Sequence, residues 1–399
     1  MKSTNLKRKI AIFTGNRAEY GLQYPIIAAV KNHPDLTCHL MVSGAHLDPN
    51  FGNTLEEIKN DGFDIDCEIK IPVPEDSLYG TTQAIGSAII NISKELHRLK
   101  PDIFVVYADR FEGFAAVFAG TQMAIPVAHI EGGDLTEGGA LDDMVRHAMT
   151  KLAHLHFTTN EDASRRIRAM GEESWRVHTV GFPMIDLIKD KKYSTKEEIK
   201  NKLPIDYSKP IVLFTQHSVT TEYNQAMEQL MPSIQALEKL ADEGVQIIAT
   251  FPNNDAGGLK ISRMLAERLQ NKTNFIVRNS LGRYLYHGIL ALALDRNIKV
   301  ACVGNSSSGI KETPAFGCPT VNIGSRQERR LRGENVIDCS YNEQEIYNAI
   351  QRCFSDSDFR KTCFTSINPY GLGDAGIKIA KILSEVELGK KIILKKMTI

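Results

Sequence analysis

The sequence lacks a net charge, a long apolar run and any paired cysteine motif. Its 48 Lys and Arg residues balance 48 Asp and Glu residues, which argues against nucleic acid or an anionic membrane as a partner. No stretch approaches the roughly 20 apolar residues that span a bilayer, and the N-terminus lacks a signal-peptide core. Its seven cysteines include no C-x-x-C pair, so disulfides and thiolate zinc sites are not expected. A reducing cytoplasm is the predicted location.

Familiar cofactor motifs are also missing. The glycine-containing loop 14–21 is not a G-x-G-x-x-G fingerprint, and no P-loop occurs, which disfavours NAD and ATP. The spacings typical of zinc and calcium sites are absent. His129 and Glu131 are the remaining metal-ligand candidates, although strand alternation alone places them on one face. We expect neither a metal nor another cofactor.

Short apolar runs alternate with amphipathic helical stretches, a pattern typical of parallel sheets covered by helices on both faces. The first series predicts strands over 9–15, 38–44, 101–109, 126–133 and 154–160, and helices over 21–33, 81–100, 113–123, 141–153 and 161–171. The second predicts strands over 211–218, 245–253, 274–279, 299–305 and 319–324, and helices over 222–242, 257–270, 309–316 and 343–355. We therefore expect two doubly wound α/β domains, residues 1–180 and 181–373. The segment 374–399 contains a helix that is expected to pack back on the first domain.

Carboxylates gather where the strands of the first domain end, which is the edge at which such sheets bind ligands. Asp109 and Glu131 follow two strands, and Asp142 lies at the start of a helix. Asp142 and Arg146 have i,i+4 spacing and therefore share a helix face. Simpler interpretations remain open: Asp109 pairs with Arg110, Asp142 caps its helix, or a metal binds.

Anion-binding signals occur in both halves of the chain. In the first, Arg17 lies in a strand-to-helix loop. In the second, "GNSSSGIKE" (304–312) offers hydroxyl and backbone N–H donors suited to a diphosphate, and Glu312 could accept hydrogen bonds from a ribose. The alternatives are an ordinary turn and a serine N-cap. Further polar residues follow strands in the second half: His217, Asn253 and the basic loop containing Arg326.

The ordered motifs resemble those of the hydrolysing UDP-N-acetylglucosamine 2-epimerases of the sialic-acid pathway, over about residues 8–375. The resemblance is carried by "GNRAEYG", "DRFE", "HIEGGD", "LDDMVRHAMTKLAH", "QHSVTTE", "FPNNDAG", "GNSSSGIKE" and "GSRQ…RGENV". It implies the GT-B fold, in which two Rossmann-like domains enclose the active site in the cleft between them. It also implies a homodimer, with a tetramer as the alternative, that acts on a UDP-sugar.

The implied reaction is anti elimination of UDP to a glycal, followed by hydration to the free 2-epimerised sugar. The resemblance assigns acid–base roles to Asp109, Glu131 and Asp142, and adds Arg146 and His217 to the catalytic set. The implied nucleotide-binding residues are Arg17, Arg110, Asn253, Ser306, Ser307, Glu312 and Arg326. Clustered carboxylates are expected to raise the pKa of at least one member, which would provide an acid and a base near neutral pH.

The loop between Glu131 and Asp142 bears on the identity of the sugar. Asp134 and Glu137 are expected to form a flexible wall of the sugar pocket, and Asp143 to be a helix-start charge. The loop is two residues longer than in the animal enzyme, which makes UDP-N,N'-diacetylbacillosamine the alternative substrate. "HIEGGD" and "ALDDMVRH" favour the hydrolysing branch over non-hydrolysing relatives. A GT-B glycosyltransferase and a nucleotide-sugar sensor without turnover are the rival classes.

Overall fold

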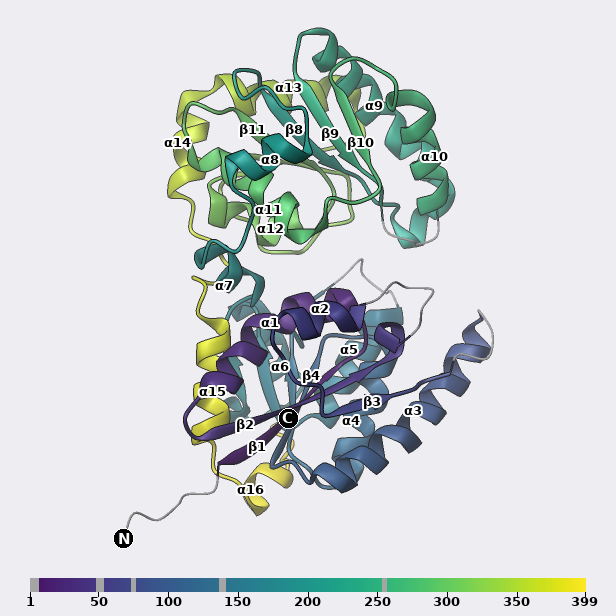
Figure 1. Cartoon of the computed structure of the whole chain (residues 1–399), viewed down its shortest axis with the longest axis vertical. Helices are drawn as coiled ribbons and strands as arrows, with labels where there is room; N and C mark the ends of the chain where they lie inside the picture. Colours follow the sequence, from purple (N-terminus) through teal and green to yellow (C-terminus); the bar gives the residue numbers. More distant parts are fainter. Residues whose placement is uncertain (1–6, 48–53, 73–76, 136–140, 253–256) are drawn as a thin grey trace. The chain divides into compact units, whose positions relative to one another are not determined.

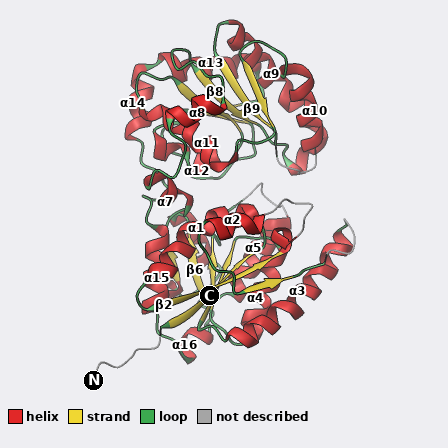
Figure 2. Cartoon of the chain, viewed as in Figure 1, coloured by secondary structure: helices red, strands yellow, loops and turns green. Residues whose placement is uncertain are grey.

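The computed structural model describes residues 7–47, 54–72, 77–135, 141–252 and 257–399, which form two compact α/β units. Unit 1 contains the chain up to Asp134, Leu141–Asp186 and Gly371–Ile399. Unit 2 contains Leu187–Tyr370. In each unit, helices cover both faces of a parallel sheet (Figure 2), which confirms the predicted fold class.

Unit 1 is built on a seven-stranded sheet with the order β3-β2-β1-β4-β5-β6-β7. All neighbouring strands that pair are parallel. The strands are β1 (Arg8–Thr14), β2 (Leu36–Ser43), β3 (Cys67–Ile69), β4 (Ile103–Tyr107), β5 (Val127–Ile130), β6 (Leu155–Thr158) and β7 (Val177–Thr179). The sequence patterns did not predict β3 and β7, because three residues are too few to establish an alternation.

Alternate residues of β1 pack on opposite faces of this sheet, as a strand requires. Ile10 and Ile12 join the core beneath α1 and α15, whereas Ala11 and Phe13 join the core beneath α3 and α4. The helices of unit 1 are α1 (Arg17–Asn32), α2 (Thr54–Asn60), α3 (Leu78–Leu99), α4 (Phe111–Gln122), α5 (Leu141–Leu152), α6 (Glu161–Ala169), α15 (Ala375–Glu385) and α16 (Lys390–Ile393), and α7 (Met184–Lys189) contains the boundary with unit 2.

Helix α1 begins four residues earlier than the sequence pattern indicated. The side chain of Asn16 caps it by accepting a hydrogen bond from the Glu19 N–H at 3.0 Å. Arg17 is consequently the first residue of a helix and not part of a loop. Its backbone position is described, whereas its side chain lies outside the described part of the structure.

Helix α15, from the end of the chain, packs beside α1 in unit 1 (Figure 1). Gly376 allows the close approach, because a Cβ there would lie 2.5 Å from the Pro25 carbonyl oxygen. The Asp186 carboxylate accepts hydrogen bonds from the Ala375 and Gly376 N–H groups at 3.0 and 2.7 Å. Beyond α15, Arg176 donates to the carbonyls of Ile392, Lys391 and Leu394, which anchors the final segment on unit 1.

Unit 2 has a six-stranded sheet with the order β10-β9-β8-β11-β12-β13, the doubly wound order of dinucleotide-binding folds. The strands are β8 (Ile211–Thr215), β9 (Gln246–Thr250), β10 (Phe275–Arg278), β11 (Val300–Gly304), β12 (Thr320–Ile323) and β13 (Val336–Cys339). The helices are α8 (Lys196–Lys202), α9 (Ala226–Asp242), α10 (Gly258–Leu269), α11 (Gly282–Ala291), α12 (Ser308–Lys311), α13 (Glu343–Ser355) and α14 (Ser357–Thr365). The sequence patterns do not indicate β13, α8, α11 or α14.

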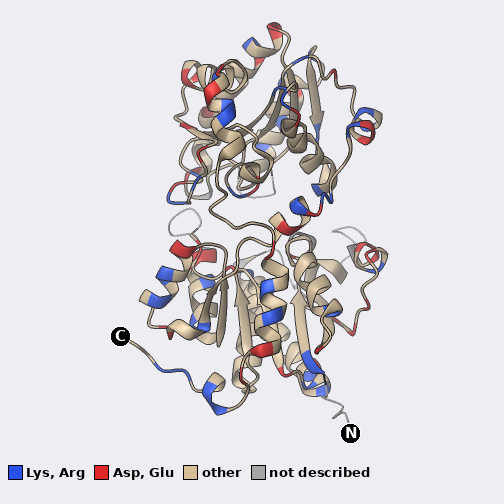
Figure 3. Cartoon of the chain, turned by 90° about the vertical axis from the view of Figure 1, so that its left-hand side faces the viewer, with Lys and Arg blue, Asp and Glu red and all other residues tan. Residues whose placement is uncertain are grey.

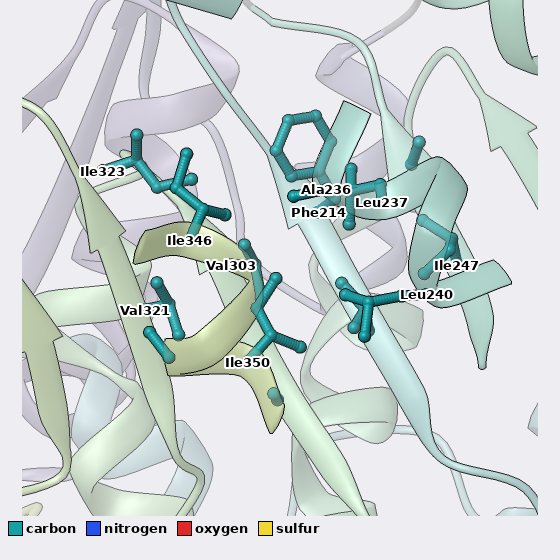
Figure 4. Close-up of a cluster of buried hydrophobic side chains, with 14 of the residues drawn as sticks. Phe214, Ala236, Leu237, Leu240, Ile247, Val303, Val321, Ile323, Ile346 and Ile350 are labelled. Carbon is teal, nitrogen blue, oxygen red and sulfur yellow. The ribbon is translucent and has the colours of Figure 1, made fainter. Parts of the chain in front are cut away.

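Helices α9 and α13 cover one face of this sheet with a continuous apolar core. Phe214 and Val303 from the strands meet Leu237 of α9 and Ile346 of α13 in this core (Figure 4). All four side chains are almost completely buried. Burial of this extent stabilises each such side chain by roughly 1.5–3 kcal/mol, so the sheet gives rigid support to the loops at its edges.

Acidic and basic residues are mixed along the chain in both units. Lys and Arg are interspersed with Asp and Glu on the ribbons of both units (Figure 3), in keeping with the formal net charge of zero. Among the described helices, none is both long and apolar enough to cross a bilayer.

Candidate functional site

The ends of β4 and β5 place Asp109 and Glu131 near one another in unit 1. These strands pair directly, with Tyr107 opposite Ile130, and the Ala108 N–H donates to the Ile130 carbonyl at 3.0 Å. Ala108 and Glu131 have positive φ angles of 57° and 63°. Non-glycine residues adopt this conformation at an energetic cost, and such residues cluster at functional sites.

Glu131 is buried, with 8% of its surface exposed, and it accepts a hydrogen bond from the Tyr107 hydroxyl at 2.5 Å. Burial, and then the nearby charge of Glu131, raise the pKa of Tyr107 well above its usual value. The phenol therefore remains a hydrogen-bond donor at physiological pH. Tyr107 thus orients the carboxylate, and the sequence patterns had not identified it.

Arg146 of α5 connects several parts of this edge. Its side chain is only 5% exposed and forms an ion pair with Asp109. It also donates to the Asp134 carbonyl at 2.9 Å and lies 3.4 Å from a carboxylate oxygen of Asp143. The i,i+4 spacing predicts that Asp142 and Arg146 share a helix face. In the structure, however, Asp142 is exposed, and it is Asp143 that is buried close to Arg146. Asp143 is therefore more than a helix-start charge.

Asp134 is a buried anchor and not part of a flexible wall, which corrects the expectation from the sequence. It is 7% exposed, and its carboxylate accepts hydrogen bonds from Thr159 and Asn160 at 3.3 and 3.1 Å. Glu137 lies outside the described residues.

His129 is occupied by structural hydrogen bonds. Its Nε2 lies 2.6 Å from the Ala108 carbonyl, which can only accept, so Nε2 carries the proton, and Nδ1 lies 3.3 Å from the Thr150 hydroxyl. Burial lowers the pKa of His129 to about 4, so the ring is neutral. Nε2 is thus engaged by the backbone, which accounts for the orientation of the His129 ring without a ligand. Within the described residues, no three His, Cys, Asp or Glu side chains form a group that could hold a metal ion.

Two carboxyl groups outside the predicted catalytic set, Glu19 and Glu112, have raised pKa values. Glu19 accepts a hydrogen bond from the Gly15 N–H at 3.0 Å, and burial and the charge of Glu112 raise its pKa to about 7. Burial also raises the pKa of Glu112, whose carboxylate lies 3.3 Å from Nε of Arg110. Burial alone would lower the pKa of Arg110. The negative charges of Glu112, Glu19 and Asp142 outweigh this effect, so the pKa of Arg110 is raised. In the sequence, Glu19 could have been recognised as the acidic residue of the motif "GNRAEYG", which directly follows a strand.

We expect Glu19→Gln to flatten the pH dependence of stability. Because the pKa of Glu19 is about 7 in the folded state against 4.5 for the free group, the folded state binds more protons between these values. The stabilisation is present below pH 4.5 and is lost as the pH rises to about 7. The loss between pH 5 and pH 8 should therefore be about 2–3 kcal/mol smaller in the variant.

Denaturant unfolding of unit 1 at both pH values measures this difference. The exposed Glu68→Gln is the matched control, and it should leave the pH dependence unchanged. The contributions of the other titrating groups to the pH dependence of stability cancel in this comparison, because these groups are common to all three proteins. Equal pH dependence of Glu19→Gln and the wild type would contradict the expectation.

In unit 2, Asn305 joins the loops that follow β8 and β11. Its side chain accepts from the His217 N–H at 2.7 Å and donates to the His217 carbonyl at 2.9 Å. Its own carbonyl accepts from Arg326 at 3.1 Å and from Gln327 at 2.9 Å. Two predicted residues, His217 and Arg326, are thus brought together by Asn305, which lies in the motif "GNSSSGIKE" but was not among the predicted site residues. Strands β8 and β11 flank the point where the strand order reverses. Doubly wound sheets bind their ligands at this point.

The serine loop lies directly after Asn305. Ser306 and Ser307 are half-buried, and Ser307 at the N-cap of α12 makes no side-chain capping bond. Helix capping therefore does not explain why position 307 carries a hydroxyl group. Ser308 is held by the Tyr286 hydroxyl at 2.7 Å, and the Ser306 hydroxyl lies 3.2 Å from that of Ser308.

Glu312 is oriented by His287 of α11. Its Oε2 lies 2.7 Å from Nε2 of His287, and the side chains are 13% and 2% exposed. His287 was missed because it lies on a helix that the sequence pattern had not predicted. Asn253, the remaining predicted nucleotide-binding residue, lies outside the described residues.

Comparisons with known proteins identify relatives in sequence and in structure. A family model described as UDP-N-acetylglucosamine 2-epimerase matches residues 28–384. A UDP-N-acetylglucosamine 2-epimerase from Neisseria meningitidis serogroup B is 33% identical over 353 residues, covering 88% of this chain and 89% of the relative. A hydrolysing UDP-N,N'-diacetylbacillosamine 2-epimerase from Legionella pneumophila is 33% identical over 388 residues, covering 97% and 98%. The solved UDP-GlcNAc 2-epimerase structure from Neisseria meningitidis, bound to UDP-GlcNAc, has a TM-score of 0.78 at 19% identity, covering 94% of this chain and 99% of that one.

Proposed function

This chain belongs to the UDP-N-acetylglucosamine 2-epimerase family, and we propose that it is a hydrolysing member. The proposed reaction converts UDP-N-acetylglucosamine and water into N-acetylmannosamine and UDP, for the biosynthesis of nonulosonic, sialic-type acids. The observation that carries the proposal is the pair of oriented carboxylates at adjacent strand ends, one buried and one half-buried. These are Asp109, paired with Arg146, and Glu131, bonded to Tyr107.

The proposed chemistry needs a base and an acid on a weakly acidic sugar. A carboxylate removes the C2 proton while the C1–O bond breaks, and the electron pair leaves with UDP as C1 and C2 form a double bond. Water then adds its oxygen to C1, and C2 is reprotonated on the opposite face. We assign these proton transfers to Asp109, Glu131 and Asp142, because acid–base catalysis requires positioned groups of this type.

We assign binding of the nucleotide to unit 2 and action on the sugar to unit 1. Ser306 and Ser307 supply donors for the diphosphate, and Glu312, oriented by His287, accepts from the ribose. Asn305 holds His217 and Arg326 in place, and His217 acts at the reacting end or beside the diphosphate. Arg17, Arg110 and Asn253 complete the proposed substrate-binding set, and Arg146 positions Asp109.

UDP-N,N'-diacetylbacillosamine is the second candidate substrate, and its product would be 2,4-diacetamido-2,4,6-trideoxymannose for legionaminic acid. The Legionella relative named for this sugar and the Neisseria relative named for UDP-N-acetylglucosamine are both 33% identical to this chain. Identity therefore does not discriminate between them. We further propose that the enzyme works in the cytoplasm as a homodimer, with a tetramer as the alternative, which size-exclusion chromatography with light scattering would test.

Proton NMR of the reaction in heavy water tests the proposal with both UDP-sugars and no acceptor. We expect one of them to yield UDP and a free 2-epimerised sugar that carries deuterium at C2. A UDP-linked product would instead indicate a non-hydrolysing epimerase. If both mixtures stay inert, the proposed activity is wrong, and a glycosyltransferase or a sensor becomes the better interpretation.

A further inference from the structure

Unit 2 contains a cavity of about 290 Å³ at the N-terminal ends of β11 and β12, whereas the serine loop follows the C-terminal end of β11. Its floor includes Val300, the first residue of β11, and Pro319, which directly precedes β12. Helix α14 supplies part of its wall (α14 and β11 are both labelled in Figure 1). Gly304 and the serine loop follow the other end of β11, so this cavity is separate from the proposed nucleotide-binding residues.

Three cationic side chains line the cavity: Arg296, Arg360 and Lys361. Of the acidic residues nearby in sequence, Asp295 pairs with Lys196 at 2.5 Å and Asp356 pairs with Arg352 at 3.0 Å. Asp358 of α14 is exposed and is the one carboxylate close in sequence to Arg360 and Lys361 that could offset part of their charge. Throughout the described ranges, no carboxylate forms an ion pair with any of the three cations. In a chain with equal numbers of acidic and basic residues, this is a local excess of positive charge.

Two of the three cationic groups, those of Arg360 and Arg296, have contacts of their own. Nη2 of Arg360 donates to the carbonyls of Arg296 and Ile298 at 2.8 and 3.3 Å. The guanidinium of Arg296 lies 4.9 Å from the ring centroid of Phe364, which also lines the cavity. A guanidinium over an aromatic ring is a favourable arrangement, and fixed donors lose less conformational entropy when an anion binds.

We propose that this cavity is a second ligand site, specific for a small organic anion that carries a flat apolar ring. The anionic group, a carboxylate or a phosphate, contacts Arg296, Arg360 and Lys361, which provide charge-assisted hydrogen bonds. The ring packs against Phe364, Pro319 and Val300. The volume is at the lower limit of typical ligand pockets, so the ligand is small. This inference does not depend on the proposed epimerase activity.

Fluorine NMR with 4-fluorophenyl phosphate tests the site on the full chain, with UDP at saturation to occupy the nucleotide site. We expect the probe signal to broaden and shift on titration with protein. 4-Fluorobenzyl alcohol, which has the ring without the charge, should not bind. Inorganic phosphate, which has the charge without the ring, should displace the probe at least tenfold less effectively than phenyl phosphate.

Variants assign the binding to this cavity. Arg296→Gln and Lys361→Gln should each weaken probe binding about tenfold, the usual effect of losing one hydrogen bond to a charged group. Ala293→Leu, which fills the cavity from its wall, should abolish binding while keeping all three charges. The exposed Lys299→Gln does not alter the lining and is the control.

Four results would overturn the proposal: no binding to the wild type, probe binding that is seen only when UDP is left out, equal displacement by inorganic phosphate, or unchanged binding to the variants. Lys361 is exposed, so Lys361→Gln should fold normally and keeps the test decisive if Ala293→Leu does not fold.

Discussion

Exchanging Glu131 for Gln is expected to lower turnover of the UDP-sugar by about 10²- to 10⁴-fold. Gln preserves the shape of the side chain, and its carbonyl oxygen can still accept the hydrogen bond from Tyr107. The amide cannot take up or release the proton that the proposed reaction requires. UDP affinity should stay within about threefold of wild type, because we place nucleotide binding in unit 2. Steady-state rates and UDP titration by calorimetry separate the two effects.

Asp109→Asn should give a comparable loss of rate, with an additional cost in stability. Arg146 is almost completely buried against Asp109, and removing one partner of a buried pair typically costs about 3–5 kcal/mol. Thermal unfolding therefore has to accompany the rate measurement for this variant. Asp64→Asn, at a side chain that is 99% exposed, is the matched control and should change neither quantity. Near wild-type rates in both Glu131→Gln and Asp109→Asn would remove these residues from the mechanism.

Gly304→Ala should destabilise unit 2 by at least about 4 kcal/mol, a loss confined to severe steric or packing defects. Gly304 ends β11 with φ of +126°, and a Cβ there would lie 2.0 Å from the Thr215 carbonyl oxygen in the neighbouring β8. The clash is with backbone, so it can be relieved only by separating the two strands. Asn305 follows immediately and organises His217 and Arg326, so UDP binding should weaken as well.

Gly244→Ala is the control that isolates the steric effect. Gly244 also has a positive φ, +89°, but a Cβ there would meet no atom within 4 Å. Its substitution should cost only the conformational strain, about 1–2 kcal/mol. Denaturant unfolding followed in unit 2 measures both variants. Equal destabilisation would show that backbone strain, and not the contact with Thr215, determines the requirement for glycine at position 304.

The local patterns of the sequence were sufficient for the fold class and for several residues at the strand ends. Apolar runs of strand length alternate with amphipathic helices, and this periodicity depends only on neighbouring residues. Asp109, Glu131, His217 and Ser306 follow such runs directly, so the rule for parallel sheets placed them at the ligand-binding edge. Strands of three residues, such as β3 and β7, are too short to carry this signal.

The sequence by itself determined two doubly wound sheets and the acidic and polar residues at their edges. Only the tertiary structure decided which carboxylates are buried and which groups hold them. Tyr107 reaches Glu131 across two adjacent strands, Arg146 reaches Asp109 from a helix, and Asp143 is buried where Asp142 is exposed. Glu19 acquires its raised pKa from burial and from Glu112, which is distant in sequence. The physical reason is that desolvation and charge pairing depend on what surrounds a side chain in space, whereas a sequence pattern records only its neighbours along the chain.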